Sequence, residues 1–361
     1  MTKEFIFAII FHRLYPLIFG GVVMDEVVSI QDKDYKELLI KLDERIEKGQ
    51  KETARAVVKS MLSTFWDMGH DIVEYEQDGR KHAVYGDKLM KNLSRDLTLL
   101  KGKGYSVPNL YNMRQFYQVY PDGYEELLPL TWSHVCILMR IENKVERDFY
   151  QKQCISEKWD KRTLMRQKKS ALFLRLAENK NKDEIMSLAR NGVTIEKPAD
   201  VIKDVYTLDF LNVKSDELSD ESDLENRLIK NLEDFMLELG KGFTFVKEQY
   251  PLRINNRTYH CDLVFYHRIL KCFFLIDLKI DAVQHEDIGQ MNMYMGYFAE
   301  EINEPDDNPP IGLVLAREKD ELMVKYATYG MDPNLFVSKY QLYLPDEGDL
   351  RRLISDVLDE E

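Results

Sequence analysis

The sequence predicts an α+β protein in which an all-α N-terminal part precedes a mixed α/β part. Apolar residues recur at helical spacing almost throughout residues 34 to about 181. Two later runs, 259–266 and 271–280, are rich in β-branched and aromatic residues, as strands are. An acidic run, 215–223, separates the two patterns. We therefore expect at least two domains, which also fits a chain of 361 residues.

The N-terminus is not expected to enter a membrane. Residues 5–11 and 14–23 are apolar, but His12, Arg13 and Pro16 keep the runs below the roughly 18 to 20 residues that span a bilayer. No signal-peptide pattern is convincing. Because Met24 is followed by two acidic residues, residues 1–23 are interpreted as an upstream extension. The four cysteines show no CxxC spacing, which predicts reduced thiols and a cytoplasmic protein.

Residues 24–190 form the predicted helical domain. Its helical spacing is clearest at Tyr35, Leu38, Leu39, Leu42, Val57, Met61, Leu62 and Phe65. A helix over 86–97 is expected to end at Gly102 and Gly104, and Ser106 is expected to cap a second helix with Pro108 in its first turn. Two helices joined by a short glycine-containing turn predict a helix-turn-helix or winged-helix-like unit.

The second helix of this unit carries polar residue types that hydrogen-bond bases or phosphates in a major groove. They are Asn109, Tyr111, Asn112, Arg114 and Gln115. Residues 80–175 hold 19 Lys and Arg against 10 Asp and Glu, in a chain of net charge -13. This local excess favours nucleic-acid binding over the alternative that the basic segment 161–169 is the solvated face of a long helix.

Residues 191–222 are expected to be a linker and residues 223–361 the second domain. Strands are predicted at 243–249, 311–316 and 323–328, in addition to the two runs that form a hairpin. Residues 301–310 are expected to be a loop. The sequence has no Gly-rich phosphate loop, no nucleotide motif and no internal repeat.

The hairpin sets two carboxylates beside each other if its connection has an even length. Pairing Tyr266 with Lys271 would place Asp262 opposite Leu275, with Asp277 the next residue on the same face. Asp262, Asp277 and Lys279 would then share one face, and Ile276, Leu278 and Ile280 would share the other. An odd connection would break this arrangement, and the sequence leaves the register open.

Two carboxylates on one face of apolar strands repel unless a cation lies between them. Oxygen ligands without a His or Cys cluster favour Mg²⁺, with Mn²⁺ as an alternative. A lysine on the same face can hold water or a phosphate oxygen, which suits phosphodiester hydrolysis. On the following helix, Gln290 and Tyr294 are four residues apart and can both point to the sheet. The ordinary alternatives are a charged strand end and, for Tyr294, a core aromatic.

These residues resemble the RecB-like branch of the PD-(D/E)XK nuclease superfamily and, within it, the YhcG family. The resemblance rests on the hairpin and on residues 285–294, and it covers nearly all of the chain from about residue 34. It implies a restriction-endonuclease-like αβββαβ core. Two positions depart from the common pattern, since Cys261 replaces the proline and Asp277 stands where many members carry glutamate.

The resemblance also implies roles for individual residues. Asp262, Asp277 and the backbone carbonyl of Leu278 would bind the metal, and Glu225 on the first core helix would complete the set. Lys279 would position the attacking water and stabilise the transition state, while Gln290 would orient Lys279 or a ligand. Tyr294 completes the catalytic candidates.

The function expected is a Mg²⁺-dependent nuclease that is directed to double-stranded DNA by its helical domain. A homodimer is a reasonable expectation because cutting both strands often takes two active sites. The alternative is a protein that keeps the nuclease fold to bind nucleic acid or a protein partner without cleavage.

Overall fold

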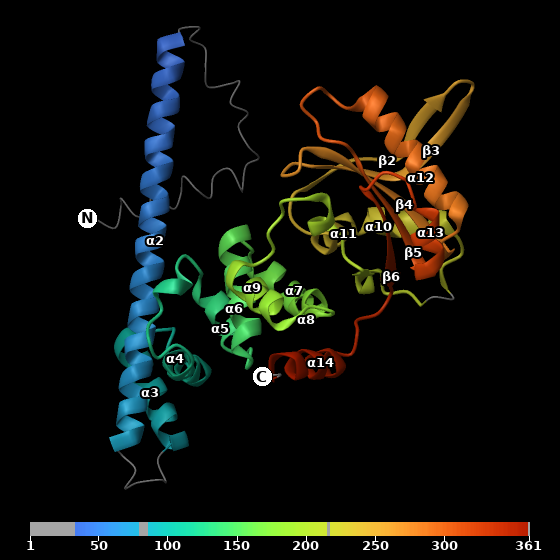
Figure 1. Ribbon diagram of the computed structural model, residues 1–361. Helices are drawn as coiled ribbons and strands as arrows, with labels where there is room; N and C mark the ends of the chain where they lie inside the picture. Colours follow the sequence, from blue (N-terminus) through green and yellow to red (C-terminus); the bar gives the residue numbers. More distant parts are fainter. Residues whose placement is uncertain (1–32, 79–85, 215–216, 360–361) are drawn as a thin grey trace. The chain divides into compact units, whose positions relative to one another are not determined.

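The computed structural model describes residues 33–78, 86–214 and 217–359 (Figure 1). The expected extension, 1–23, lies outside these residues. The chain divides into two units, 1–61 and 62–361. Of the first unit, the described part is the N-terminal portion of α2 (Lys33–Asp78). None of the described helices combines the length and apolar character that a membrane crossing requires.

The second unit begins with the remainder of α2 and seven shorter helices, which confirms the predicted helical region. The seven helices are α3 (Gly86–Lys101), α4 (Val107–Val119), α5 (Trp132–Leu138), α6 (Lys144–Glu157), α7 (Lys161–Lys169), α8 (Leu172–Ala177) and α9 (Lys182–Asn191). As expected, Gly102 and Gly104 follow α3, both at positive φ, and Pro108 lies in the first turn of α4. Leu110, Met113 and Phe116 bury one face of α4. This face packs against Ile72 of α2 and Met90 of α3.

The C-terminal part of the second unit is built on one six-stranded sheet. Its strands are β1 (Val205–Thr207), β2 (Phe243–Ile254), β3 (Arg257–His267), β4 (Cys272–Ala282), β5 (Ile311–Glu318) and β6 (Leu335–Gln341). The order is β1-β6-β5-β4-β3-β2. β2, β3 and β4 form an antiparallel meander, whereas β4, β5, β6 and β1 are parallel.

Helices cover both faces of this sheet, in two apolar layers (Figure 1). The first layer is formed by α10 (Glu221–Lys230) and α11 (Leu232–Leu239), packed on Leu263, Phe265 and Ile276. The second is formed by α12 (His285–Tyr297) and α13 (Glu321–Ala327), packed on Val264, Leu275 and Val314. The order α10, β2, β3, β4, α12, β5 confirms the predicted αβββαβ core.

The hairpin register differs from the expected one by two residues. Tyr266 pairs with Phe273 rather than with Lys271, so residues 268–271 form a four-residue connection. Lys271 has a φ of 48° and turns the chain into β4. Because the shift is even, the faces of the β4 residues are those predicted. Ile276 and Leu278 pack in the α10 layer, and Leu275, which shares the face of Asp277, packs in the α12 layer.

The predicted strand at 323–328 is wrong, since these residues overlap α13. Asp320 begins this helix by accepting hydrogen bonds from the backbone N–H groups of Leu322 and Met323. Met323, Val324 and Ala327 share one helical face and pack against the α12 layer. Tertiary packing of that face outweighs the strand propensity of an apolar run, and the next strand is β6.

The expected linker, 191–222, contains β1, which pairs with β6 at the edge of the sheet. A buried ionic cluster fixes this segment to the helical region. Arg175 on α8 donates to both carboxylate oxygens of Glu238, at 2.7 and 2.9 Å, and Glu238 also accepts from the backbone N–H of Thr207. Lys203 Nζ lies 3.3 Å from the same carboxylate. At the other end of the chain, Arg351 on α14 (Glu347–Asp359) reaches Glu146 at 2.6 Å.

Candidate active site

The candidate site lies where β3 and β4 separate. The last paired residues are Leu263 and Ile276. Cys261 and Val264 pack in the same layer although they are three residues apart, so the alternation of β3 shifts by one residue around Asp262. Asp262 Oδ2 therefore turns to the backbone of β4 and accepts a hydrogen bond from the N–H of Leu278 at 2.7 Å. The structure thus brings Asp262 beside the Asp277–Lys279 segment.

Lys279 is surrounded by carboxylates. Its Nζ lies 2.9 Å from Asp277 Oδ2, 3.6 Å from Glu221 and 3.8 Å from Asp287. Burial alone would lower the pKa of Lys279, but Asp277 and the other carboxylates outweigh burial and raise it above the ordinary value. The side chain is consequently an ammonium at neutral pH, which can stabilise negative charge but has no lone pair to accept a proton. Sequence reasoning missed Glu221 and Asp287, because neither belongs to the hairpin motif.

Gln249 joins the two remaining acids. Its Nε2 donates to Glu225 Oε2 at 2.8 Å and to Asp262 Oδ1 at 3.0 Å. Gln249 lies in β2 with a φ of 45°, close to a bulge between Phe245 and Lys247. This left-handed backbone re-aims the side chain across the strand. No sequence signal could have found Gln249, because a glutamine in a strand does not indicate a positive φ.

Gln290 and Tyr294 lie on the same side of α12, as expected. The Tyr294 hydroxyl, to which Gln290 donates, points to the backbone of β3. Gln290 donates to the hydroxyl of Tyr294, and the Tyr294 hydroxyl donates to the backbone carbonyl of His260 at 3.0 Å. The Tyr294 side chain is buried among Met291, Met295 and other residues of the α12 layer. Gln290 is thus held next to β3, with Tyr294 as its anchor.

The donor chemistry of this site fits a hard divalent cation. Glu225 Oε1 is buried and accepts no hydrogen bond from any residue that the structure describes, and the buried Asp277 Oδ2 lies 2.9 Å from the Lys279 ammonium. Burial and the neighbouring Asp262 raise the pKa of Asp277 to about 7, and burial likewise raises the pKa of Glu225 to about 7. Burial also raises the pKa of Asp262. The single ammonium of Lys279 does not balance the carboxylates of Asp262, Asp277 and Glu225, and an oxygen-preferring cation would compensate the remaining negative charge.

The carboxylate oxygens of Asp262, Asp277 and Glu225 do not all lie within 4.8 Å of one another. Within the described ranges, one group of three His, Cys, Asp or Glu side chains has all its possible ligand atoms within 4.8 Å of one another. It consists of His70, Asp71 and Glu74. That group lies on the surface of α2, where acidic side chains are commonly found without a metal. At the candidate site, the Gln249 amide and the Lys279 ammonium occupy part of the space between the carboxylates.

The predicted nucleic-acid contacts on α4 have several internal partners. Asn109 donates to the Gly104 carbonyl and accepts from Trp132 Nε1, which fixes the turn before α4. Arg114 pairs with Glu76 at 2.7 Å, and Gln115 donates to the Met139 carbonyl. Tyr111 is exposed. Three of the five residues predicted to contact nucleic acid, Asn109, Arg114 and Gln115, therefore make contacts within the helical region.

Comparison with known proteins matches the helical region and the sheet region to two separate families of domains. Residues 199–355 match the YhcG PDDEXK nuclease domain, and residues 41–175 match the DUF1016 N-terminal domain. A protein of Escherichia coli (strain K12) named "Putative nuclease YhcG" is 36% identical over 337 residues, which cover 84% of this chain and 89% of that protein. The crystal structure of a repair endonuclease from Pyrococcus abyssi is similar at 16% identity and a TM-score of 0.25. That similarity covers 36% of this chain and 48%, about half, of the endonuclease.

Proposed function

This chain belongs to the YhcG family of PDDEXK nuclease-domain proteins, and we propose that it is a Mg²⁺-dependent nuclease that cleaves double-stranded DNA. The observation that carries the proposal is the junction of β3 and β4, where Asp262, Asp277 and Lys279 meet. Buried carboxylates beside a charged lysine are the groups that metal-assisted phosphodiester hydrolysis needs.

Asp262, Asp277 and Glu225 are the side chains proposed to hold the cation, together with the backbone carbonyl of Leu278. The bound cation would supply Lewis-acid activation of water and screening of phosphate charge. The buried Glu225 Oε1, which lacks a hydrogen-bonding partner among the described residues, supports this assignment, as does the excess of carboxylates over the one ammonium of Lys279.

Lys279 is proposed to stabilise the additional negative charge on the phosphate as the attacking oxygen adds to it. Its ammonium is held by Asp277 and Asp287 from two different elements, β4 and α12, so its position is fixed before substrate binds. A positioned charge in a partly buried site needs little reorganisation during the reaction. Gln290 is proposed to contact the substrate or Lys279, with Tyr294 as its positioning residue.

The helical region is proposed to bind DNA through its basic surface. Lys161, Arg162 and Lys169 on α7 are exposed, and Tyr111 is exposed on α4. A homodimer would bring two active sites to the two strands of a duplex. All four cysteines are free thiols, which supports the proposal that the protein is cytoplasmic.

The experiment is a cleavage assay with plasmid, linear duplex, single-stranded DNA and RNA, in Mg²⁺ or Mn²⁺. The wild type is compared with Asp277→Ala and Lys279→Ala, and Asp183→Ala at an exposed position of α9 is the matched control. We expect duplex cleavage that both site variants lose and the control keeps. Binding without cleavage by the wild type in either metal would instead favour the non-catalytic binding protein.

A further inference from the structure

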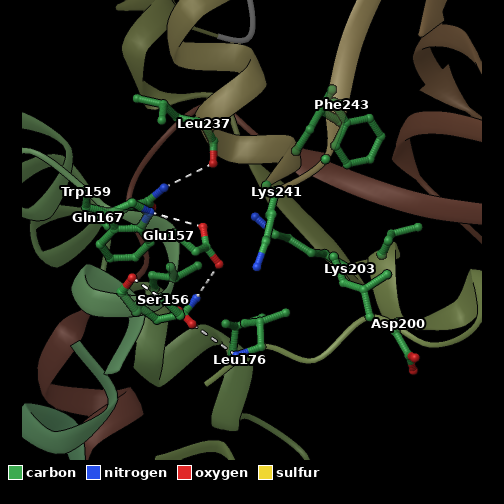
Figure 2. A pocket seen from close by; sticks show the side chains of 18 of the residues that line it. Ser156, Glu157, Trp159, Gln167, Leu176, Asp200, Lys203, Leu237, Lys241 and Phe243 are labelled. Carbon is green, nitrogen blue, oxygen red and sulfur yellow. Dashed lines mark hydrogen bonds between the residues drawn. The ribbon is translucent and has the colours of Figure 1, made fainter. Parts of the chain in front are cut away.

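A pocket lies at the opposite end of the strands from the candidate active site. It has a volume of about 490 Å³ and is lined by α6, α11 and the turn that leads into β2, so the helical region and the nuclease core both contribute (Figure 2). Arg268, at the end of β3, lines this pocket and is six residues from Asp262. At roughly 3.3 Å per strand residue, about 20 Å separate the two positions along β3. The pocket is thus a separate site.

Of the basic side chains that line this pocket, Lys203 pairs with Glu238, and the other three have no ion-pair partner among the described residues. Lys158, Lys241 and Arg268 line it, and in the described part of the chain none of their side chains has an ion-pair partner. The acidic side chains in the wall accept hydrogen bonds from neutral donors. Glu157 accepts from Gln153 and from Trp159 Nε1, and Asp200 accepts from the backbone N–H groups of residues 196 and 197. These neutral donors leave both carboxylates charged, and Lys241 lies close enough to Glu157 to offset part of the rise that burial causes in its pKa, but the basic side chains of the wall still outnumber the acidic ones.

Lys241 is held by a turn that other residues could not easily form. Gly240 and Gly242 flank it at φ values of 110° and 100°, and a Cβ at Gly242 would come within 2.6 Å of His267 Nε2. The backbone N–H of Leu270 donates to His267 Nδ1, so the neutral ring carries its proton on Nε2 and donates to the Lys241 carbonyl at 3.0 Å. Figure 2 shows the Lys241 side chain projecting from this turn into the pocket.

Trp159 adds an aromatic wall to the same pocket. Its indole N–H is fixed on Glu157 Oε2 at 3.1 Å, which sets the orientation of the ring. An aromatic side chain beside lysine and arginine is the combination that binds a base by stacking and a phosphate by charge. The volume falls within the range of roughly 300 to 1,000 Å³ that is typical of small-molecule sites.

We propose that this pocket binds a nucleoside phosphate, with the phosphate against Lys241 and Arg268 and the base near Trp159. The ligand would contact α6 of the helical region and the start of β2 together. Its binding therefore stabilises the arrangement of these two parts of the second unit.

The test is isothermal titration calorimetry of the full chain with adenosine 5′-monophosphate, adenosine and inorganic phosphate. EDTA is present throughout, so that binding through a divalent metal does not contribute. We expect the monophosphate to bind at least about tenfold more tightly than adenosine or phosphate alone, because both of its parts are recognised. Lys241→Ala and Arg268→Ala should each weaken binding by about tenfold or more, as loss of a charge-assisted hydrogen bond predicts. Lys325→Ala, an exposed lysine on α13, should leave binding unchanged.

Three outcomes would overturn the proposal. The first is no binding of the monophosphate at millimolar concentration, and the second is equal binding by wild type and Lys241→Ala with a normal melting temperature. The third is phosphate binding as tight as nucleotide binding, which would leave the base unrecognised. Because the readout is binding without metal, the result does not depend on nuclease activity.

Discussion

Asp262 Oδ2 accepts a hydrogen bond from the backbone N–H of Leu278 at 2.7 Å, across the point where β3 and β4 separate. This contact takes the place of strand pairing at the residue that follows Asp277. It fixes a carboxylate of one strand against the backbone of the next, and it brings Asp262 close enough to raise the pKa of Asp277. The site therefore forms because β3 and β4 separate after the Leu263–Ile276 pair, which lets the Asp262 side chain reach the backbone of β4.

Metal binding should stabilise the protein through Asp277. At a Mg²⁺ concentration 100-fold above its dissociation constant, the folded state should gain about 2.7 kcal/mol. Differential scanning fluorimetry should show a higher melting temperature with Mg²⁺ than with EDTA for the wild type. Asp277→Asn removes the charge but keeps the shape, and should abolish both this shift and cleavage. An undiminished shift in Asp277→Asn would place the metal elsewhere.

Gln249→Ala should impair the site although the Gln249 side chain carries no charge. The substitution leaves Glu225 and Asp262 without their shared donor. Because Gln249 is itself exposed and Glu225 is buried, losing this donor should cost about 1 kcal/mol of unfolding free energy. We expect cleavage to fall about tenfold or more, measured as initial rate at saturating Mg²⁺. Gln50→Ala, at an exposed position of α2, is the control, and wild-type rates for Gln249→Ala would show that the bridge has no catalytic importance.

Tyr294→Phe should separate the two interpretations of this residue. The ring stays in the apolar layer, while the hydrogen bond to the His260 carbonyl is lost. Stability should fall by about 1 kcal/mol in urea denaturation. If Tyr294 only anchors Gln290, we expect cleavage to stay within about threefold of wild type, and Gln290→Ala to lose more. A hundredfold loss in Tyr294→Phe with normal stability would assign the hydroxyl to the chemistry.

Acid should weaken the fold through Glu238. Burial alone would raise the pKa of Glu238, but Lys203 and Arg175 outweigh burial and lower it to about 2. Because the folded pKa is below the unfolded one of about 4.5, the stabilisation is present above pH 4.5 and disappears as pH falls towards 2. A shift of this size corresponds to about 3 kcal/mol.

The measurement is urea denaturation at pH 7, 4.5 and 3. The wild type should lose more stability on acidification than Glu238→Gln, whose side chain does not titrate. Arg175→Met should cost about 3 to 5 kcal/mol at pH 7, because Glu238 would keep only part of its charge compensation in a buried position. Parallel pH curves for wild type and Glu238→Gln would contradict this assignment.

DNA affinity should depend on the basic face of α7. We expect the combined Lys161→Ala, Arg162→Ala and Lys169→Ala variant to bind duplex DNA more weakly in fluorescence anisotropy. The slope of log affinity against log salt should fall by up to about 3, since each phosphate contact contributes roughly 0.9. Arg166 is left intact because it pairs with Asp209 at 2.6 Å and supports the fold. An unchanged slope would make α7 an ordinary solvated helix.

The sequence by itself determined the helical region, the hairpin, and the pairing of Gln290 with Tyr294 on one helix. These features depend on local periodicity, which residue order carries directly. The face of Asp277 was also predictable, because a register shift of two residues preserves the alternation of a strand.

Only the tertiary structure decided how the site is completed. Glu225 reaches Asp262 through Gln249, whose left-handed backbone near a bulge has no sequence signature. Residues 323–328 became part of a helix because their apolar face packs against the α12 layer. Contacts between residues far apart in the chain depend on how layers pack and where strands separate, and local residue patterns do not encode these distances.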